Sequence, residues 1–471
     1  MGKGFLRVKG PEIVDESGQK VFLRGVCFGG WLNMENFITG YPGAESTLRA
    51  AVREELGEER YGAFFRSLLD SFITEEDFAF LAELGATVVR IPFNYRHFES
   101  DLNPGEYDPA GFHYLDKAVS WAQKHGLYVI LDLHAAPGWQ NQGWHSDNPY
   151  GISLLWADRH CQERVKDLWL YIASHYKDEP QVAGYNLLNE PNAPGMEILN
   201  KLYREWTEAI RTVDRRHIVF IEGNQYSQIF EGLEEPFDEN LVYSSHNYTP
   251  ATHSAGKYPG EVGGEYVDAA WMERAFLERN GWILKRGRPS WIGEFGALFD
   301  GPADAPTPAD LARLAALRDQ LAVFNRHEQH WTIWTYKDVG AQGLVVPREE
   351  SEYMRRIRPF LAFKRRLGLD PWTARSRGAL LAAARSLVEI LIQAAAEELD
   401  DYRLDGRILA QEFIERAISG KLANAAAPLF AARFADMTAA EIEKMHREAF
   451  AFSHCRRRPA LIEVLREAMK G

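Results

Sequence analysis

Two glutamates stand at the ends of short apolar stretches and could act together as a pair of catalytic carboxylates. Glu190 follows the apolar stretch Val182–Asn189, and Glu294 follows Ser290–Gly293. Pro191 has no backbone N–H, so a strand leading to Glu190 must stop there. Two facing carboxylates about 5–5.5 Å apart can cleave a glycosidic bond with retention, one as nucleophile and one as acid and then base. The pair therefore predicts glycoside hydrolysis, provided that the fold brings both strand ends together.

Further polar and aromatic residues lie at the ends of the other apolar stretches. They are Arg90, His134, Asn189, His246, Tyr248 and Trp334. We expect Arg90 to hold Glu294 in its ionised form and Asn189 to donate its amide to a sugar 2-hydroxyl. The histidines would orient hydroxyl groups or the acid, the tyrosine would hydrogen-bond the nucleophile, and the tryptophan would form the floor beneath the sugar. The acid must keep its proton near neutral pH, and we expect a neighbouring anion to raise its pKa.

The apolar stretches alternate with helical patterns along the chain. We predict eight strands, at Val21–Cys27, Ala86–Pro92, Leu127–Leu133, Val182–Asn189, His217–Ile221, Leu241–Ser245, Ser290–Gly293 and Trp331–Tyr336. Near-continuous apolar strands that alternate with helices are typical of an α/β fold with a parallel sheet covered by helices. Eight such units over about 350 residues favour a (β/α)8 TIM barrel over an open sheet. In that barrel the active site lies at the C-terminal strand ends, where the fourth and seventh strands would deliver the two glutamates.

The composition changes after about Arg366, where Ala, Leu, Glu and Arg become dominant. We therefore place a catalytic barrel at residues 1–366 and a helical C-terminal appendage at residues 367–471. Amphipathic helices are predicted at Leu380–Leu399, Gly406–Ile418, Ala439–Phe450 and Leu461–Met469. We expect the appendage to be a packing or dimerisation module, and a homo-oligomer could form through its helices.

Charge and cysteine content limit the classes of function. The formal net charge is −13, which argues against a nucleic-acid partner because phosphate binding needs a basic face. Cys27, Cys161 and Cys455 are too few and too scattered for a disulfide framework or a zinc site, so we expect buried thiols in a reducing compartment. No membrane-spanning run is seen, and Met1–Gln19 lacks a secretory apolar segment. We expect a cytoplasmic protein, or a secreted one if a signal has been removed.

Two other classes of barrel protein were compared with the hydrolase. A metal-dependent barrel hydrolase needs His-x-His after the first strand, where Phe28-Gly29-Gly30 stands instead, so we expect no metal. His327-Glu328-Gln329-His330 also lacks the His-Glu-x-x-His spacing. A non-catalytic carbohydrate-binding barrel normally lacks one catalytic carboxylate, and both are present. The sequence contains no P-loop, dinucleotide fingerprint or Gly-x-Ser-x-Gly elbow, and we expect no cofactor.

Six motifs taken together resemble those of glycoside hydrolase family five, a group of clan A retaining β-glycosidases. In chain order they are Val88-Val89-Arg90-Ile91-Pro92, Asp132-Leu133-His134, Leu188-Asn189-Glu190-Pro191, His246-Asn247-Tyr248, Ile292-Gly293-Glu294-Phe295-Gly296 and Ile333-Trp334-Thr335. The resemblance covers about residues 20–365 and implies a (β/α)8 barrel and a retaining mechanism. It also implies that Glu190 is the acid/base and Glu294 the nucleophile.

The N-terminal half is similar to the exo-β-1,3-glucanase branch of that family. The similar stretches include Gly29-Gly30-Trp31-Leu32 with Glu35 three residues on, Tyr114-Leu115-Asp116-Lys117-Ala118, and Ala136-Pro137-Gly138 leading to Gln140-Asn141. The branch implies that Glu35 binds the terminal sugar in a pocket, and hence exo action on β-glucosides or short β-linked oligosaccharides. The motifs around His246 and Glu294 follow the branch less closely. A β-mannosidase, a glycolipid glucosidase or an endo-β-1,4-glucanase would therefore fit the same catalytic pair.

Overall fold

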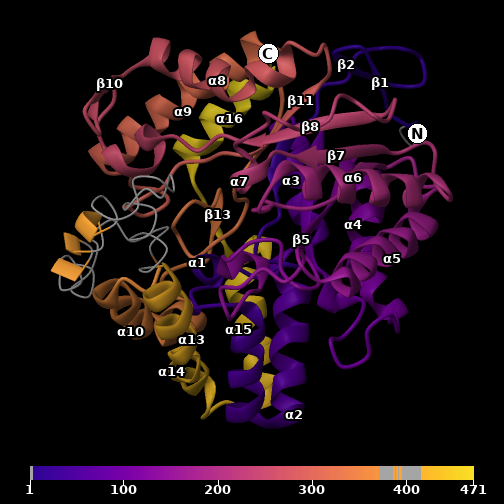
Figure 1. The fold of residues 1–471 in the computed structure, drawn as a ribbon. Helices are drawn as coiled ribbons and strands as arrows, with labels where there is room; N and C mark the ends of the chain where they lie inside the picture. Colours follow the sequence, from indigo (N-terminus) through magenta and orange to yellow (C-terminus); the bar gives the residue numbers. More distant parts are fainter. Residues whose placement is uncertain (1–3, 371–385, 388, 391, 395–414, 471) are drawn as a thin grey trace.

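The computed structural model describes residues 4–370, 386–387, 389–390, 392–394 and 415–470. Its centre is a closed barrel of eight parallel strands (Figure 1). The neighbours around the barrel run in the order β11-β12-β3-β4-β5-β6-β7-β8, so consecutive barrel strands lie side by side and the last pairs with the first. This confirms the (β/α)8 barrel.

All eight predicted apolar stretches form barrel strands. They are β3 (Arg24–Cys27), β4 (Val88–Asn94), β5 (Tyr128–Ala135), β6 (Val182–Asn186), β7 (Ile218–Glu222), β8 (Leu241–His246), β11 (Ser290–Glu294) and β12 (His330–Ile333). Two of them end earlier than the sequence suggested. β6 ends at Asn186, and beyond it the N–H of Leu187 donates to Phe220 of β7 while the N–H of Asn189 donates to Leu133 of β5. Trp334, expected inside the last strand, lies just beyond it.

Long helices surround the barrel. They are α2 (Glu45–Phe72), α3 (Glu75–Leu84), α4 (Phe112–His125), α5 (Arg159–Tyr176), α6 (Met196–Arg211), α8 (Ala269–Leu284), α9 (Pro308–Arg326) and α10 (Glu352–Leu367), with short helices α1 (Asn36–Thr39) and α7 (Asn224–Ser227). Local chemistry fixes their ends. The Asp77 carboxylate accepts the backbone N–H of Thr74 at the start of α3, and Gly85 ends that helix in the left-handed conformation.

The end of the barrel opposite the strand C-termini is closed by apolar side chains. The N-terminal hairpin of β1 (Arg7–Lys9) and β2 (Glu12–Val14) contributes Leu6 and Ile13 to a buried cluster with residues from inside the barrel. That cluster includes Ile130, Phe220 and Trp291. Because this end is filled, substrate access is left to the C-terminal ends of the strands.

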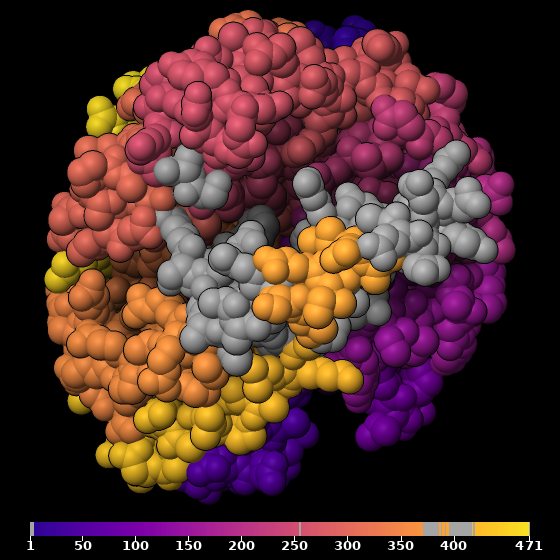
Figure 2. All heavy atoms as spheres, turned by 60° about the vertical axis from the view of Figure 1, so that its left-hand side comes forward, coloured from indigo at the N-terminus to yellow at the C-terminus, as the bar shows by residue number. Residues whose placement is uncertain are grey.

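The described C-terminal residues pack against the barrel's helices. They form α13 (Ala423–Ala425), α14 (Ala427–Ala431), α15 (Ala439–Phe450) and α16 (Pro459–Lys470), so the predicted helices Ala439–Phe450 and Leu461–Met469 are confirmed. Leu380–Leu399 and Gly406–Ile418 lie largely outside the described residues. Figure 2 shows yellow C-terminal segments against indigo N-terminal ones at its lower edge. Between α2 and α15, the rings of Phe64 and His446 pack with their centroids 4.6 Å apart.

One C-terminal side chain reaches the loops above the barrel. The Asn424 carbonyl oxygen accepts the backbone N–H of Ala44 at 2.9 Å, and its amide donates to the carbonyl of Pro149 at 3.0 Å. Glu45, the residue after Ala44, accepts a hydrogen bond from the backbone N–H of Met34, which directly precedes Glu35. The C-terminal helices therefore support two loops above the barrel, and one of them carries Glu35, a predicted site residue.

Two short sheets lie outside the barrel. β9 (Gly260–Val262) pairs with β10 (Glu265–Val267), and β13 (Val345–Val346) pairs with β14 (Arg456–Arg457) of the C-terminal part. Within the described residues, no helix is both long and apolar enough to cross a membrane.

Candidate active site

Glu190 follows β6 in an unusual backbone conformation. Its φ is +46°, in the left-handed region that costs a non-glycine residue about 1–3 kcal/mol. Two bonds hold it there. Its N–H donates to Glu222 Oε2 at 2.8 Å, and its carbonyl accepts from Asn141 Nδ2 at 2.9 Å. Strain maintained by flanking partners in this way is typical of a functional position.

Glu294 ends β11 and faces Glu190 across the strand ends. Its two oxygens are bound by different groups, since Arg90 Nη1 lies 2.5 Å from Oε1 and the Tyr248 hydroxyl donates to Oε2 at 2.8 Å. A carboxylate oxygen of Glu190 lies within 4.8 Å of one of Glu294. Retaining glycosidases hold their carboxylates about 5–5.5 Å apart, whereas inverting enzymes need about 6.5–9.5 Å. The separation therefore suits retention.

Arg90, in the middle of β4, is the buried cation of the site. Its Nη2 lies within hydrogen-bond or ion-pair distance of four further oxygens, on Asp132 (3.1 Å), Asn186 (3.2 Å), Asn189 (2.8 Å) and Glu222 (3.3 Å). Burial lowers the pKa of Arg90, but the charges of Asp132 and Glu294 outweigh burial and raise it well above its usual range. Arg90 therefore stays charged, and it forms the ion pair with Glu294 that the sequence led us to expect.

The two predicted histidines have different partners. His246 Nδ1 lies 2.7 Å from Glu190 Oε1, while His134 lies between Asp132 Oδ2 (2.7 Å) and Glu35 Oε1 (3.1 Å). Burial lowers the pKa of each imidazole, but the neighbouring carboxylates raise it to about 10 in both. His246 thus contacts the expected acid, and His134 links the barrel to Glu35.

The pKa of Glu190 differs from the expectation. Burial raises it, but hydrogen bonds with His145 and His246 outweigh burial and hold it below its usual range when both imidazoles donate. We expected the nearby anion to raise it. Glu294 cannot do so alone, because Arg90 neutralises it and two imidazoles flank Glu190.

Trp334 and Asn189 complete the predicted set. The indole of Trp334 stacks on His134 with ring centroids 5.3 Å apart and an interplanar angle of 6°. Asn189 accepts from Arg90 through Oδ1, while its Nδ2 lies 3.2 Å from His134 Nε2. All nine predicted residues therefore belong to one set of contacts, with Glu35 joined to it through His134.

Sequence reasoning gave no role to four residues of this site, namely Asp132, Asn141, His145 and Glu222. Glu222 ends a barrel strand, and that position was a signal that could have been used. His145 lies in the short helix η3 (Trp144–Ser146), within a loop, where its Nε2 comes 3.1 Å from Glu190 Oε2. Nothing in the sequence around His145 shows that its loop folds back onto the acid.

Glu190, His246 and Glu294 bring three ligand-type atoms within 4.8 Å of one another. Both Glu294 oxygens already bind Arg90 or Tyr248, and a guanidinium at 2.5 Å repels a second cation. The donor set fits acid–base chemistry, and we assign none of these residues as a metal ligand. That the enzyme needs no metal or cofactor stays a prediction.

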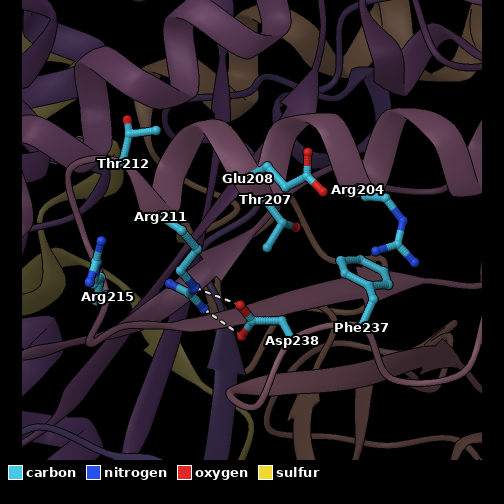
Figure 3. Close-up of a pocket in the computed structure, with 8 residues that line it drawn as sticks. All are labelled: Arg204, Thr207, Glu208, Arg211, Thr212, Arg215, Phe237 and Asp238. Carbon is cyan, nitrogen blue, oxygen red and sulfur yellow. Dashed lines mark hydrogen bonds and ion pairs between the residues drawn. The ribbon is translucent and has the colours of Figure 1, made fainter.

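A separate cavity of about 300 Å³ lies near the N-terminal ends of β7 and β8, far from the strand ends that carry the glutamates. Figure 3 shows the residues that line it, from α6 and from the segment before β8, with Arg211 paired to Asp238 at 2.7 and 2.9 Å. Of the other charged residues in the lining, Arg204 pairs with Glu234 outside the cavity, and we assign the cavity no chemistry.

Comparison with known proteins decides the family. A family model described as Cellulase (glycosyl hydrolase family 5) matches residues 60–340. The chain belongs to glycoside hydrolase family 5. It is a glycosidase, and the resemblance in the motifs is confirmed.

Relatives within family 5 differ in what they act on. A protein named β-xylosidase from Phanerodontia chrysosporium is 37% identical over 98% of this chain and 97% of its own length. Endoglucanase C from Acetivibrio thermocellus is 31% identical over 59% of this chain and 88% of its own length. A probable glucan 1,3-beta-glucosidase A from Emericella nidulans is 28% identical, with coverages of 68% and 86%. The β-xylosidase similarity therefore includes the C-terminal region.

Solved structures agree on the fold. The crystal structure of an endogalactoceramidase superposes with a TM-score of 0.52 at 20% identity, over 71% of this chain and 75% of that one. At this identity the match supports the barrel and carries no statement about substrate.

Proposed function

We propose that this family 5 enzyme is a retaining, exo-acting β-glycosidase in which Glu294 is the nucleophile and Glu190 the acid/base. The observation that carries the proposal is the pair of carboxylates within 4.8 Å, with a guanidinium on one and two imidazoles on the other. Such different surroundings suit one carboxylate that stays ionised and one that exchanges a proton.

The proposed reaction has two steps. Glu294 attacks the anomeric carbon while Glu190 gives its proton to the leaving oxygen, and a covalent glycosyl-enzyme forms. Glu190 then takes a proton from water as that water attacks the anomeric carbon and releases Glu294. Arg90 and Tyr248 hold Glu294 in line. Asn189 binds the 2-hydroxyl, a contact that strengthens in the transition state.

Replacing each carboxylate tests the roles. We expect Glu294→Gln to abolish turnover and Glu190→Ala to slow cleavage of a glycoside with a poor leaving group by about 10²–10⁴-fold. Azide should restore activity of Glu190→Ala on an activated aryl glycoside and give a β-glycosyl azide. An α-azide would mean that the two roles are exchanged, and full activity of either variant would contradict the mechanism.

Exo action on β-glucosides or short β-linked oligosaccharides is supported by Glu35, because His134 contacts it and is connected through Asp132 and Arg90 to Glu294. A carboxylate beside the first sugar can bind its terminal hydroxyls and block a longer chain. Xylosidase activity is the second candidate, because the relative named β-xylosidase matches almost the whole chain. β-Mannosidase, glycolipid glucosidase and endo-β-1,4-glucanase activities stay open alternatives.

A substrate panel separates these activities. We expect aryl β-glucoside or β-xyloside to exceed β-mannoside in kcat/KM, and β-linked oligosaccharides to release monosaccharide alone from the first minutes. Products would be followed by chromatography over time. Early mixtures of shorter oligosaccharides would contradict the pocket and favour the endoglucanase.

Two further expectations stay proposals. Location in a reducing compartment such as the cytoplasm is supported by Cys27, Cys161 and Cys455, which are all buried free thiols. Self-association through the C-terminal helices is supported by exposed Leu422 and Leu429 on that part of the surface.

A further inference from the structure

The pair formed by Asn141 and His145 has no part in the mechanism above, yet it touches the acid directly. His145 Nε2 lies 3.1 Å from Glu190 Oε2 and 2.9 Å from Asn141 Nδ2. Asn141 also bonds the backbone of Glu190. What these contacts do to the proton of Glu190 depends on which atoms carry hydrogen.

Two backbone groups fix the orientation of the Asn141 amide. The N–H of Gly143 can only donate, and it lies 2.8 Å from Oδ1. The carbonyl of Glu190 can only accept, and it lies 2.9 Å from Nδ2. Exchanging the amide oxygen and nitrogen would set donor against donor and acceptor against acceptor at a buried side chain. The second hydrogen of Nδ2 therefore points at His145 Nε2.

That hydrogen decides the state of His145. A nitrogen that faces an N–H donor must present its lone pair, so the imidazole is neutral and carries its hydrogen on Nδ1. The same lone pair lies 3.1 Å from Glu190 Oε2. It repels the lone pairs of a carboxylate, and protonation of Oε2 relieves that repulsion. This contact therefore favours the neutral form of Glu190, while His246 Nδ1 lies 2.7 Å from the other oxygen, Oε1.

We propose that Asn141 is a positioning residue that favours the protonated form of Glu190, because it prevents His145 Nε2 from donating a hydrogen bond to the carboxylate. The proposal rests on Glu190 being the acid. Release of the proton from Glu190 to the leaving oxygen then needs no rearrangement of the loop. Without Asn141, His145 could hold a proton on Nε2 and donate to Glu190, which would favour the carboxylate.

Other titratable and charged groups also face this pair, and they stay unchanged when Asn141 is replaced. Around Glu190 they are His246 of β8, Glu222 of β7, Glu294 of β11, Arg90 of β4 and Tyr248 after β8. Around His145 they are His134 of β5, Tyr226 of α7 and Glu35. Among them, His246 contacts the other oxygen of Glu190. Because His246 is present in both the wild-type chain and the Asn141 variant, comparing these two isolates the effect of Asn141.

The test is the pH dependence of kcat/KM for Asn141→Ala on two aryl β-glycosides. With the 4-methylumbelliferyl glycoside, whose leaving group needs a proton from the acid, we expect the basic limb of the kcat/KM profile to shift to lower pH by about one unit. This shift corresponds to about 1.4 kcal/mol in favour of the ionised form of Glu190. With 2,4-dinitrophenyl, which leaves without a proton, kcat/KM should stay within about twofold. The proposal would be overturned if the basic limb of the pH profile did not shift, or if kcat/KM fell equally on both glycosides.

His145→Phe supplies the matched background. In the double variant, Asn141→Ala should no longer move the basic limb, because no imidazole remains to take the proton. A shift that persists without His145 contradicts the proposed route. Glu190→Ala separates this inference from the mechanism. If Glu190→Ala keeps its activity on the methylumbelliferyl glycoside, the assignment of Glu190 as the acid has failed. If Glu190→Ala loses that activity but Asn141→Ala does not shift the basic limb of the pH profile, only the present proposal is overturned.

A measurement on the wild-type chain does not depend on the Asn141 variant folding. With ¹⁵N-labelled histidine, the imidazole signal that disappears in His145→Phe is assigned to His145. We expect this imidazole to carry its hydrogen on Nδ1, and an Nε2–H signal for it in the resting protein would overturn the proposal.

Discussion

At the scale of single residues, Arg90 shows why the site could be predicted only in part. Its position after an apolar stretch predicted an ion pair with Glu294, and the ion pair is present. Its contacts with Asp132 and Glu222 depend on which strand ends meet around the barrel. Those acidic partners orient the arginine. The sequence around such an acid does not distinguish it from a catalytic acid at a strand end.

Gly29→Ala tests the positioning of Trp334. A Cβ on Gly29 would lie 2.5 Å from the indole ring and 2.9 Å from the hydroxyl of Thr335, so the stacked ring must move. We expect a loss of about 1–3 kcal/mol in the free energy of unfolding and a fall in kcat/KM of about tenfold or more, mainly through misplaced sugar. Urea titration and steady-state kinetics would measure both.

Gly195→Ala is the matched control for that change. A Cβ at Gly195 meets nothing within 4 Å, and the φ of −166° is open to any residue. Activity and stability should stay close to those of the wild-type chain. If Gly29→Ala were equally neutral, Trp334 would not be the sensitive floor that the stacking on His134 suggests.

At the scale of elements, the strands were predictable and their ends were not. Continuous burial on both faces produces apolar stretches, and these located all eight barrel strands. The end of β6 is set by backbone bonds to β5 and β7, which no local sequence encodes. Loops were harder still. The loop that carries Asn141 and His145 folds over Glu190 through side-chain to backbone bonds, so its role became visible only in three dimensions.

At the scale of the whole molecule, the C-terminal helices belong to the same packed core as the barrel. Residues of α14, α15 and α16 share one hydrophobic cluster with α2, α3 and the outer layer of the barrel. The composition change after Arg366 predicted a helical appendage that packs or dimerises, but sequence composition alone does not say which helices of the barrel the appendage contacts. The helices themselves were predictable from their apolar periodicity.

Asn424→Ala tests whether these helices support the site. It removes the partner of the Ala44 N–H and of the Pro149 carbonyl, which we expect to cost about 1–3 kcal/mol of unfolding free energy. We also expect KM to rise several-fold with a smaller change in kcat, since the loop that carries Glu35, the proposed ligand of the terminal sugar, loosens while the catalytic pair stays in place. Leu429→Ala, an exposed change on α14, serves as the control. Equal KM values for the two variants would show that Asn424 supports nothing in the site.

The bond between Asn424 and Ala44 joins residues 380 positions apart in the sequence. A ribosome delivers the N-terminal strands first, so the barrel and its two glutamates can assemble while residue 424 is still unmade. Contacts of such long range close last, because a large loop entropy must be overcome before they form. We therefore expect the contacts of Asn424 with Ala44 and Pro149 to form after the barrel strands have paired, so that the loop carrying Glu35 is fixed later than the two glutamates.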